Sequence, residues 1–478
     1  MTNSLETTGM DKEQYELKHV LKPIHLWGIA VGLVISGHYI GWNFGLGKTS
    51  PMGMVLATLV ITLMYVAFIF SYTELTTAIP NSGGPYAYAR RALGPFAGFI
   101  AGFATLVEFV FAPPAIALAI GSYVEFILQK FGTTLPGFIG MQPKVWIALL
   151  AFAVFIAINL MGVAIGAVFE LVVTIIAVVE LVLFYFIIGP HIRWELILTQ
   201  PLLPGGLGGL FAAIPFAIWF YLAIEGVAMS AEETANPQKD IPIGYISGLV
   251  TLVLLAMLTL ICSTGVVPAS ELATVEKPLP VAVQKVLPAG HWITQAIAIV
   301  GVFGLIASFH GIILGYSRQA FALARAHYLP AFMAKLTPKT QVPHWALIVP
   351  GLVGALACLT AYTDAIITIS AIGAIILYII SMISLIVLRR KEPDMERPYR
   401  APFYPFFPLL ALGIAVLSLI SVIWFSFHLF LIALAMFALG TIYYWFGVRK
   451  AVEASGDLLI ASDFEYVRKT GELPPLTH

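Results

Sequence analysis

The chain has 478 residues, of which 60% are hydrophobic and only 10% charged, and its formal net charge is zero. Soluble domains carry about a quarter charged residues, so this composition excludes an ordinary soluble protein. The neutral balance argues against nucleic-acid binding and against a polybasic protein of the membrane surface. Both cysteines, Cys262 and Cys358, fall in apolar runs without a CxxC or Cys/His cluster, so neither disulfides nor a metal site are expected.

Apolar runs long enough to cross a bilayer recur along the whole chain. A helix needs about 20 apolar residues to cross roughly 30 Å of hydrocarbon. The runs are apolar all round instead of alternating with polar residues, which favours helices over the strands of a barrel. The sequence therefore predicts an all-α polytopic membrane protein with twelve transmembrane helices, at residues 24–47, 51–79, 95–129, 144–164, 167–189, 208–231, 241–266, 291–325, 344–361, 364–388, 405–424 and 428–448.

The two ends of the chain are polar, and the first 23 residues lack the apolar core and cleavage site of a signal peptide. Lys and Arg favour the cytoplasmic side of a membrane. With the N-terminus inside, the outer segments hold only Lys48, Lys130, Lys144, Arg193, Lys277 and Lys285. We therefore expect residues 1–23 and 449–478 to lie in the cytoplasm. The spans between them are expected to lie in the inner membrane of a bacterial-type cell.

The first span contains polar residues and glycines at mid-depth, namely Gly37, His38, Gly41, Asn43, Gly45 and Gly47. Glycine also permits close packing between membrane helices, so a regular helix is the alternative to a local break. The sixth span, five spans later, contains Pro215 and the pair Glu225-Gly226. Broken helices in corresponding positions of two halves indicate the binding site of an inverted-repeat transporter.

Four carboxylates fall inside the predicted spans, at Glu108, Glu170, Glu180 and Glu225, and no Lys or Arg stands at mid-depth to pair with them. Ionisable groups are costly in a bilayer, so they are functional candidates. Together with carbonyls near Ser36 and Gly37, they suit an ammonium substrate. The rings of Trp219 and Tyr221 offer cation–π faces, each contributing about 0.5–2 kcal/mol.

Each candidate has an alternative role. Glu225 is expected either to contact substrate or to gate and sense protons, and Glu108 either to bind the ammonium or to make a structural hydrogen bond. Glu180 lies near the outer end of its span. It is a coupling or gating candidate with Glu225, Ser308 and His310, although a buried histidine is more often structural. Trp42 and Trp219 line the pocket or serve as packing residues.

Three stretches resemble the amino acid–polyamine–organocation permease family over about residues 20–400. They are Pro80–Arg91 after the second span, Ala231–Pro242 after the sixth, and Tyr316–Ala320 at the end of the eighth. The resemblance implies a LeuT-type fold, with two inverted five-helix repeats at residues 24–189 and 190–388. Two peripheral helices at residues 389–448 follow them.

The break of the first span departs from the commonest members of this family. Where they carry small residues whose N–H groups receive a substrate carboxylate, this chain has Gly41-Trp42-Asn43. The bulky Trp42 argues against an α-amino acid, and the stretch from His38 to Gly47 is similar to the ethanolamine permease branch. Some relatives carry a coupling lysine in the fifth span, where this chain has Ala177. The lysine-based proton mechanism therefore does not transfer to this chain. Proton coupling through Glu180, Glu225 or Glu108 is one option, beside uniport and exchange, and sodium is not indicated.

These observations predict a permease that imports ethanolamine or a related small cationic amine by alternating access, without a cofactor or metal. A proton-coupled amino acid permease is the alternative, and a transport-like membrane sensor is a second class. An enzyme is not expected, because no nucleophile–base set, metal cluster or nucleotide loop is present in the sequence. The expected partners are the substrate and the lipid bilayer.

Overall fold

The computed structural model describes residues 21–161, 167–204, 206–288, 290–337, 340 and 342–454. Regular structure in these ranges is helical, apart from two isolated bridges, Leu21 with Thr234 and Phe138 with Met141. The predicted cytoplasmic tails lie almost wholly outside the described residues. The expected all-α class is confirmed.

Nine helices of the described part are long and apolar enough to cross a membrane. They are α3 (Pro51–Ala78), α5 (Pro95–Lys130), α6 (Pro143–Leu160), α7 (Ala167–Ile188), α11 (Pro237–Val266), α14 (Trp292–Arg325), α16 (Thr363–Lys391), α17 (Phe406–Phe425) and α18 (Phe427–Tyr443), the last continued by η5 (Tyr444–Val448) and α19 (Arg449–Ala454). Proline occupies the first turn of α3, α5, α6 and α11, where its missing N–H removes no helical hydrogen bond. A tenth, shorter apolar helix is α15 (His344–Cys358).

The first and sixth predicted spans are interrupted helices. The first consists of α1 (Pro23–Val34), α2 (Ser36–Tyr39) and the 3₁₀ helix η1 (Trp42–Gly47), and the sixth of α9 (Gly206–Ala212), α10 (Ile214–Ile218) and the 3₁₀ helix η3 (Ile224–Glu233). Gly41 has φ +102°, a conformation that favours glycine, and Ala223 has φ +77°, which a residue with a side chain adopts at a cost of about 1–2 kcal/mol. The expected breaks are therefore present. The nine long helices, α15 and these two interrupted spans together make the expected twelve spans in the described part of the chain.

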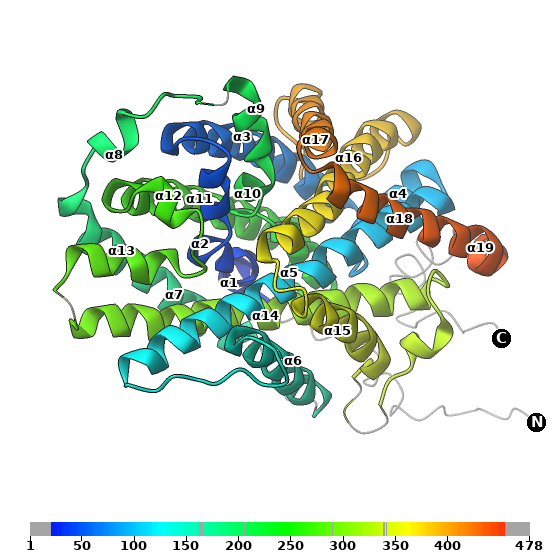
Figure 1. Cartoon of the computed structure of the whole chain (residues 1–478). Helices are drawn as coiled ribbons and strands as arrows, with labels where there is room; N and C mark the ends of the chain where they lie inside the picture. The colour runs from blue at the N-terminus through cyan, green and yellow to red at the C-terminus, as the bar shows by residue number, and fades with distance from the viewer. Residues whose placement is uncertain are drawn as a thin grey trace, which may run out of the picture.

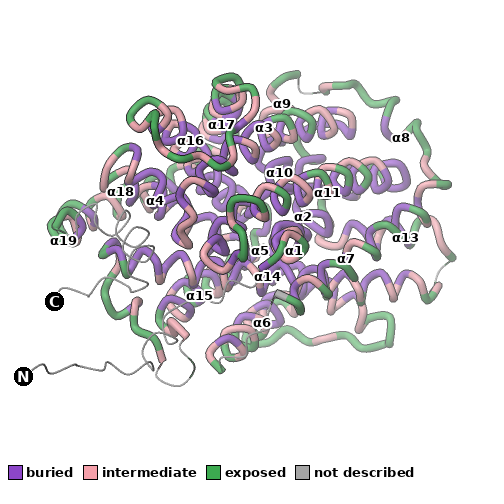
Figure 2. The backbone as a smooth tube through the Cα atoms, turned by 180° about the vertical axis from the view of Figure 1, so that it is seen from behind, coloured by how far each residue is buried: buried purple, intermediate pink, exposed green. Residues whose placement is uncertain are grey.

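The interrupted helices occupy the middle of the bundle. Figure 1 shows α1, α2 and α10 at the centre, with α3, α5, α11, α14 and α16 around them. Buried backbone gathers in the same central region in Figure 2. The remaining helices are short: α4 (Pro85–Leu93), η2 (Gly189–His191), α8 (Glu195–Leu198), α12 (Ala269–Leu272), α13 (Pro278–Val286), η4 (Ala331–Ala334), η5 (Tyr444–Val448) and α19 (Arg449–Ala454).

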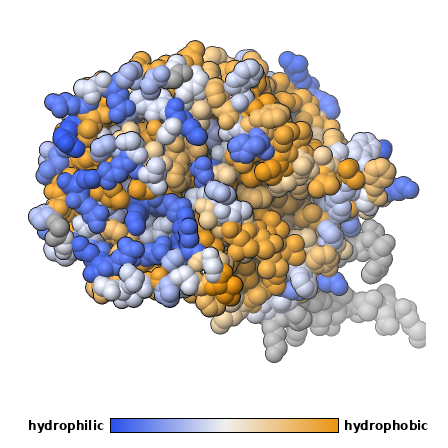
Figure 3. All heavy atoms as spheres, in the orientation of Figure 1, coloured by the Kyte–Doolittle hydropathy of each residue, from blue (hydrophilic) through white to orange (hydrophobic). Residues whose placement is uncertain are grey.

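The outer surface is largely apolar. Phe186 on α7 and Trp424 on α17 are 76% and 78% exposed, which is typical of side chains that face lipid. In Figure 3 hydrophobic residues fill the middle and upper part of the visible face, while hydrophilic residues gather at the left, where α8, α12 and α13 lie. The predicted division into repeats at residues 24–189 and 190–388 stays a prediction.

Candidate functional site

The two interrupted spans touch each other at their breaks. A Cβ atom added to Gly37 would lie 2.4 Å from the carbonyl oxygen of Trp219, and one added to Gly41 would lie 2.3 Å from its indole ring. The Trp219 Nε1–H donates a hydrogen bond of 2.9 Å to the carbonyl of Ile40. Glycine at both positions therefore lets the end of α10 approach the break of the first span.

Two serines connect the first span to α14. The Ser308 hydroxyl donates to the carbonyl of Leu33, and the Ser36 and Ser308 hydroxyls lie 2.8 Å apart. The Ser308 hydroxyl has one proton, which it donates to the Leu33 carbonyl, so Ser36 is the donor in the second bond. The predicted coupling candidate Ser308 thus positions the end of α1 and the start of α2.

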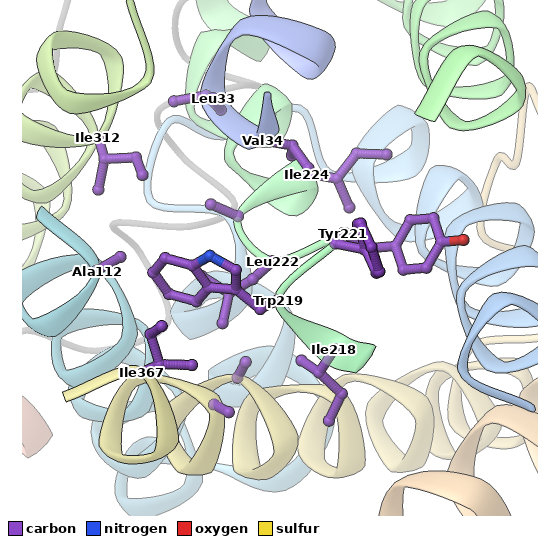
Figure 4. Packing of buried hydrophobic residues seen from close by; sticks show 14 of the residues in the cluster. Leu33, Val34, Ala112, Ile218, Trp219, Tyr221, Leu222, Ile224, Ile312 and Ile367 are labelled. Carbon is purple, nitrogen blue, oxygen red and sulfur yellow. The ribbon is translucent and has the colours of Figure 1, made fainter. Parts of the chain in front are cut away.

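A narrow gap with no room for a water molecule lies beside this contact. Its lining is apolar except for the Ser36 hydroxyl and the Trp219 indole, and consists of Leu33, Val34, Ser36, Ala112, Ile116, Trp219, Leu222 and Ile312. Figure 4 shows the Trp219 ring between Ala112 and Ile367, while the Tyr221 ring points away from it. Of the two aromatic faces predicted for the substrate, only Trp219 therefore borders this gap.

Glu108 and Glu225 form a buried acid pair next to the break of the sixth span. Both are fully buried, and their side chains are within hydrogen-bonding reach of each other. Glu108 Oε1 accepts from the Ala223 N–H at 3.1 Å, and Glu225 Oε2 accepts from the Tyr378 hydroxyl at 3.3 Å. Glu108 Oε2 and Glu225 Oε1 have no hydrogen-bond partner among the described residues. A proton held by one carboxyl group of the pair could be donated to the other.

No ion pair in the described ranges involves either member of this acid pair. A negative charge on this buried pair would be costly without a cation. The pair is therefore a candidate partner for a positively charged group.

Tyrosines surround this acid pair, and sequence reasoning identified only one of them. The Tyr378 hydroxyl on α16 lies 2.7 Å from that of Tyr65 on α3, and the Tyr221 hydroxyl lies 2.6 Å from that of Thr62. The rings of Tyr65 and Tyr221 are 5.0 Å apart. Tyr65 and Tyr378 occur as single polar residues in otherwise apolar runs, which is the signal that marks them in the sequence.

Two other candidates of the first break, Trp42 and Asn43, are not among the residues that line the gap. Trp42 is fully buried, donates from Nε1 to the carbonyl of His38 at 3.2 Å, and stacks on Phe220 at 5.9 Å. Asn43 accepts from the Gly41 N–H at 3.0 Å. Its amide nitrogen donates to the carbonyls of Leu272 and Val275 at 2.7 Å each.

Three further candidates lie apart from the acid pair. His38 Nε2 is 3.4 Å from the carbonyl of Leu252 on α11, and Glu180 Oε2 accepts from the Tyr39 hydroxyl at the end of α2. His310 is buried near the ring of Phe155, and neither of its nitrogens has a hydrogen-bond partner. Coupling roles for Glu180 and His310 stay predictions.

The end of the molecule that the charge bias predicts to be outside is closed by the segment that contains α12 and α13. Glu276 accepts from Lys144 at 3.0 Å, from Ser122 at 2.6 Å and from Thr363 at 2.6 Å. These residues, with Phe44, border a cavity of about 370 Å³. Burial lowers the pKa of the adjacent Lys277, and Glu125 and Glu276 oppose this effect.

The three resemblance motifs meet at the opposite end. Ser82 donates from its backbone N–H and its hydroxyl to Glu232 at 2.8 and 2.9 Å. Arg318 pairs with Glu233 at 2.9 Å, and the Leu21 N–H donates to the Glu233 carbonyl at 3.0 Å. Polar contacts therefore connect the helices at both ends of the bundle.

A helical bundle with two interrupted spans that meet at a central gap defines a multi-pass membrane transporter of the LeuT-type fold. The chain belongs to the amino acid permease family, because the model of that family matches residues 21–448. This agrees with the expected permease superfamily.

Similar proteins extend over almost the whole chain. An uncharacterized transporter of Rhizobium meliloti is 28% identical, over 84% of this chain and 86% of its own length. The branched-chain amino acid permease BcaP of Bacillus subtilis is 26% identical, over 91% and 94%. The methylthioribose transporter of the same species is 26% identical, over 93% and 97%. The protein is therefore a transporter of the amino acid type and not an enzyme.

Proposed function

We propose that the protein imports a small cationic amine, with ethanolamine as the leading candidate, across the inner membrane of a bacterial-type cell by alternating access. The observation that carries this proposal is the acid pair Glu108–Glu225, which is fully buried and has no ion-pair partner in the described part of the chain. An ammonium group provides the single positive charge that the pair lacks. The neighbouring hydroxyls of Tyr378 and Tyr65 add polar partners for a substrate hydroxyl.

The first break supports an amine without a carboxylate. The Gly41 N–H is already bonded to the side chain of Asn43, and the Trp219 indole occupies the space against Gly41. A carboxylate at this point would displace the Asn43 amide, whose nitrogen also bonds to two carbonyls of the outer segment. Leaving buried polar groups without partners costs about 1–3 kcal/mol each, which disfavours that exchange.

An aliphatic amino acid is the second candidate, and the lining of the central gap favours it. Six of the eight lining residues are aliphatic, and such a lining suits the branched apolar side chain of an amino acid substrate. One relative at 26% identity is named a branched-chain amino acid permease, and another at 26% is named a cationic amino acid transporter.

Uptake by purified protein in liposomes separates these candidates. We expect labelled ethanolamine to exchange against internal ethanolamine, and a tenfold excess of leucine to leave this exchange unchanged. Leucine exchange in the absence of ethanolamine exchange would reject the amine and favour the aliphatic amino acid. Binding of either substrate without any flux would favour the membrane-sensor alternative.

A further inference from the structure

One buried carboxyl group has no part in the site described so far. Glu170 on α7 is 8% exposed, and its Oε1 has no hydrogen-bond partner. It lies where three helices meet, because a Cβ atom added to Gly32 of α1 would be 2.4 Å from Glu170 Oε1. A Cβ atom added to Gly311 of α14 would be 3.3 Å from the same oxygen. Glycines on both neighbouring helices thus make room for this one carboxyl group.

The neighbours of Glu170 offer it no cation. No charged group in the described ranges interacts with it. On α1 the nearest titratable residue along the chain is His25, whose Nδ1 accepts from the Lys22 N–H. On α14 it is His310, whose ring lies beside Phe155 of α6. Thr174, one turn along α7, donates its hydroxyl proton to the carbonyl of Gly28 and so has none left for Glu170. A carboxylate at this junction is therefore uncompensated, whereas a protonated carboxyl group is tolerated.

The junction adjoins the wall of the central gap. Leu33 follows Gly32 and lines the gap, its side chain packs where Gly311 lacks one, and its carbonyl accepts from Ser308. Ile312, which follows Gly311, lines the gap as well. A change in the packing of α1 against α7 and α14 therefore moves two residues of the gap lining.

We propose that Glu170 is a proton-binding site that controls whether α1 packs against α7 and α14. With the proton bound, the carboxyl group is neutral and the three helices close around it, as in this structure. When the proton leaves to water, the carboxylate requires hydration and α1, the first helix of the interrupted span, separates from the other two helices. Proton release at this end of the molecule would thus open the central gap to the side on which α1 begins.

A cysteine-accessibility experiment tests this without any substrate. Leu33→Cys in the full-length protein gives a reporter on α1, and both native cysteines are buried. We expect its labelling by a membrane-impermeant maleimide, corrected for the reactivity of a free thiol, to rise at least fivefold between pH 5 and pH 9. In the Glu170→Gln background labelling should stay low at every pH. A pH-dependent rise that survives Glu170→Gln, or no rise in the parent, would overturn the proposal.

Transport gives a second test, and this one rests on the proposed function. In liposomes, an acidic exterior should stimulate uptake by the wild-type protein severalfold, and Glu170→Gln should remove the stimulation while exchange persists. Thr174→Val, which removes a hydrogen bond of the same junction but no titratable group, should keep the stimulation, as should exposed Glu195→Gln. Retained stimulation in Glu170→Gln contradicts the role of Glu170, whereas absence of ethanolamine exchange in the wild type contradicts only the substrate. If Glu170→Gln does not fold, as judged by its melting in detergent, Glu170→Met replaces it.

Discussion

At the scale of single residues, the acid pair decides the chemistry of the site. Glu108 comes from the uninterrupted helix α5 and Glu225 from the 3₁₀ segment η3, and the break at Ala223 brings the second toward the first. Ala223 also donates its N–H to Glu108, so the strained residue itself fixes the position of one carboxylate. Local strain of this kind persists where the surrounding structure requires it.

Replacing one acid of the pair should weaken binding of the substrate cation. We expect Glu108→Gln to raise the Kd for ethanolamine at least tenfold, because removal of one charged partner from a buried pair costs about 2–5 kcal/mol. Isothermal titration with the purified protein measures the change. The matched control is Glu195→Gln, an exposed glutamate on α8, which should bind as the wild type does. Equal affinity of the Glu108→Gln protein would remove the acid pair from the binding site.

Trp42 gives a second test of specificity at this scale. Its side chain is fully buried against Phe220, so Trp42→Ser leaves a void next to the first break. We expect the variant to bind leucine or alanine in competition with ethanolamine, whereas the wild type does not. Displacement of labelled ethanolamine measures this. If neither amino acid competes, Trp42 is a packing residue and does not select the substrate.

At the scale of elements, a polar cluster joins the C-terminal ends of α3 and α16. The side chain of Glu74 on α3 is only 1% exposed. It forms ion pairs with Arg389 and with Arg397, and the distance to Arg397 is 3.2 Å. It also accepts from the Ala401 N–H at 2.7 Å. Since Arg397 is only 5% exposed, the cluster buries opposite charges together.

Loss of the central acid of this cluster should destabilise the junction of α3 and α16. We expect Glu74→Gln to cost about 3–5 kcal/mol, because it leaves buried arginine charge without a partner. Thermal unfolding in detergent should show a clearly lower melting temperature. Glu453→Gln is the control, since its pair with Arg449 is about half exposed and an exposed i,i+4 pair contributes only about 0.3–0.5 kcal/mol. Equal effects of the two substitutions would contradict this assignment.

At the scale of the whole molecule, polar contacts connect the helices at both ends of the bundle. At one end Glu276 connects the α12–α13 segment to α5, α6 and α16, and at the other end Glu232 and Glu233 connect the three resemblance motifs. Alternating access requires that these two sets of contacts break in turn.

Weakening the contacts of Glu276 should open its end of the molecule. We expect Glu276→Gln to raise several-fold the rate at which an impermeant maleimide labels a Phe44→Cys reporter, because Phe44 and Glu276 line the same cavity and the contacts of Glu276 hold its walls together. The same reporter with Glu195→Gln should label at the parent rate. An unchanged rate in Glu276→Gln would mean that other contacts hold this end closed.

The sequence by itself determined the helical, membrane-spanning architecture, because long apolar runs have few alternatives in a bilayer. It also located the two breaks, since glycines, a proline and polar residues at mid-depth are poorly suited to a regular span. Tertiary structure decided which candidates meet. The direction of a side chain at a break depends on backbone angles such as φ +77° at Ala223, which residue types do not reveal.

For the same reason Trp219 faces the gap while Tyr221, two residues later, points to α3. Glu108 and Glu225 are more than a hundred positions apart in the chain, so their pairing was not visible in the sequence. The Ser36–Ser308 bond and the junction of Glu170 with two glycines depend in the same way on how distant helices pack. Composition sets the membrane environment, and the contacts between interrupted and continuous helices set the chemistry within it.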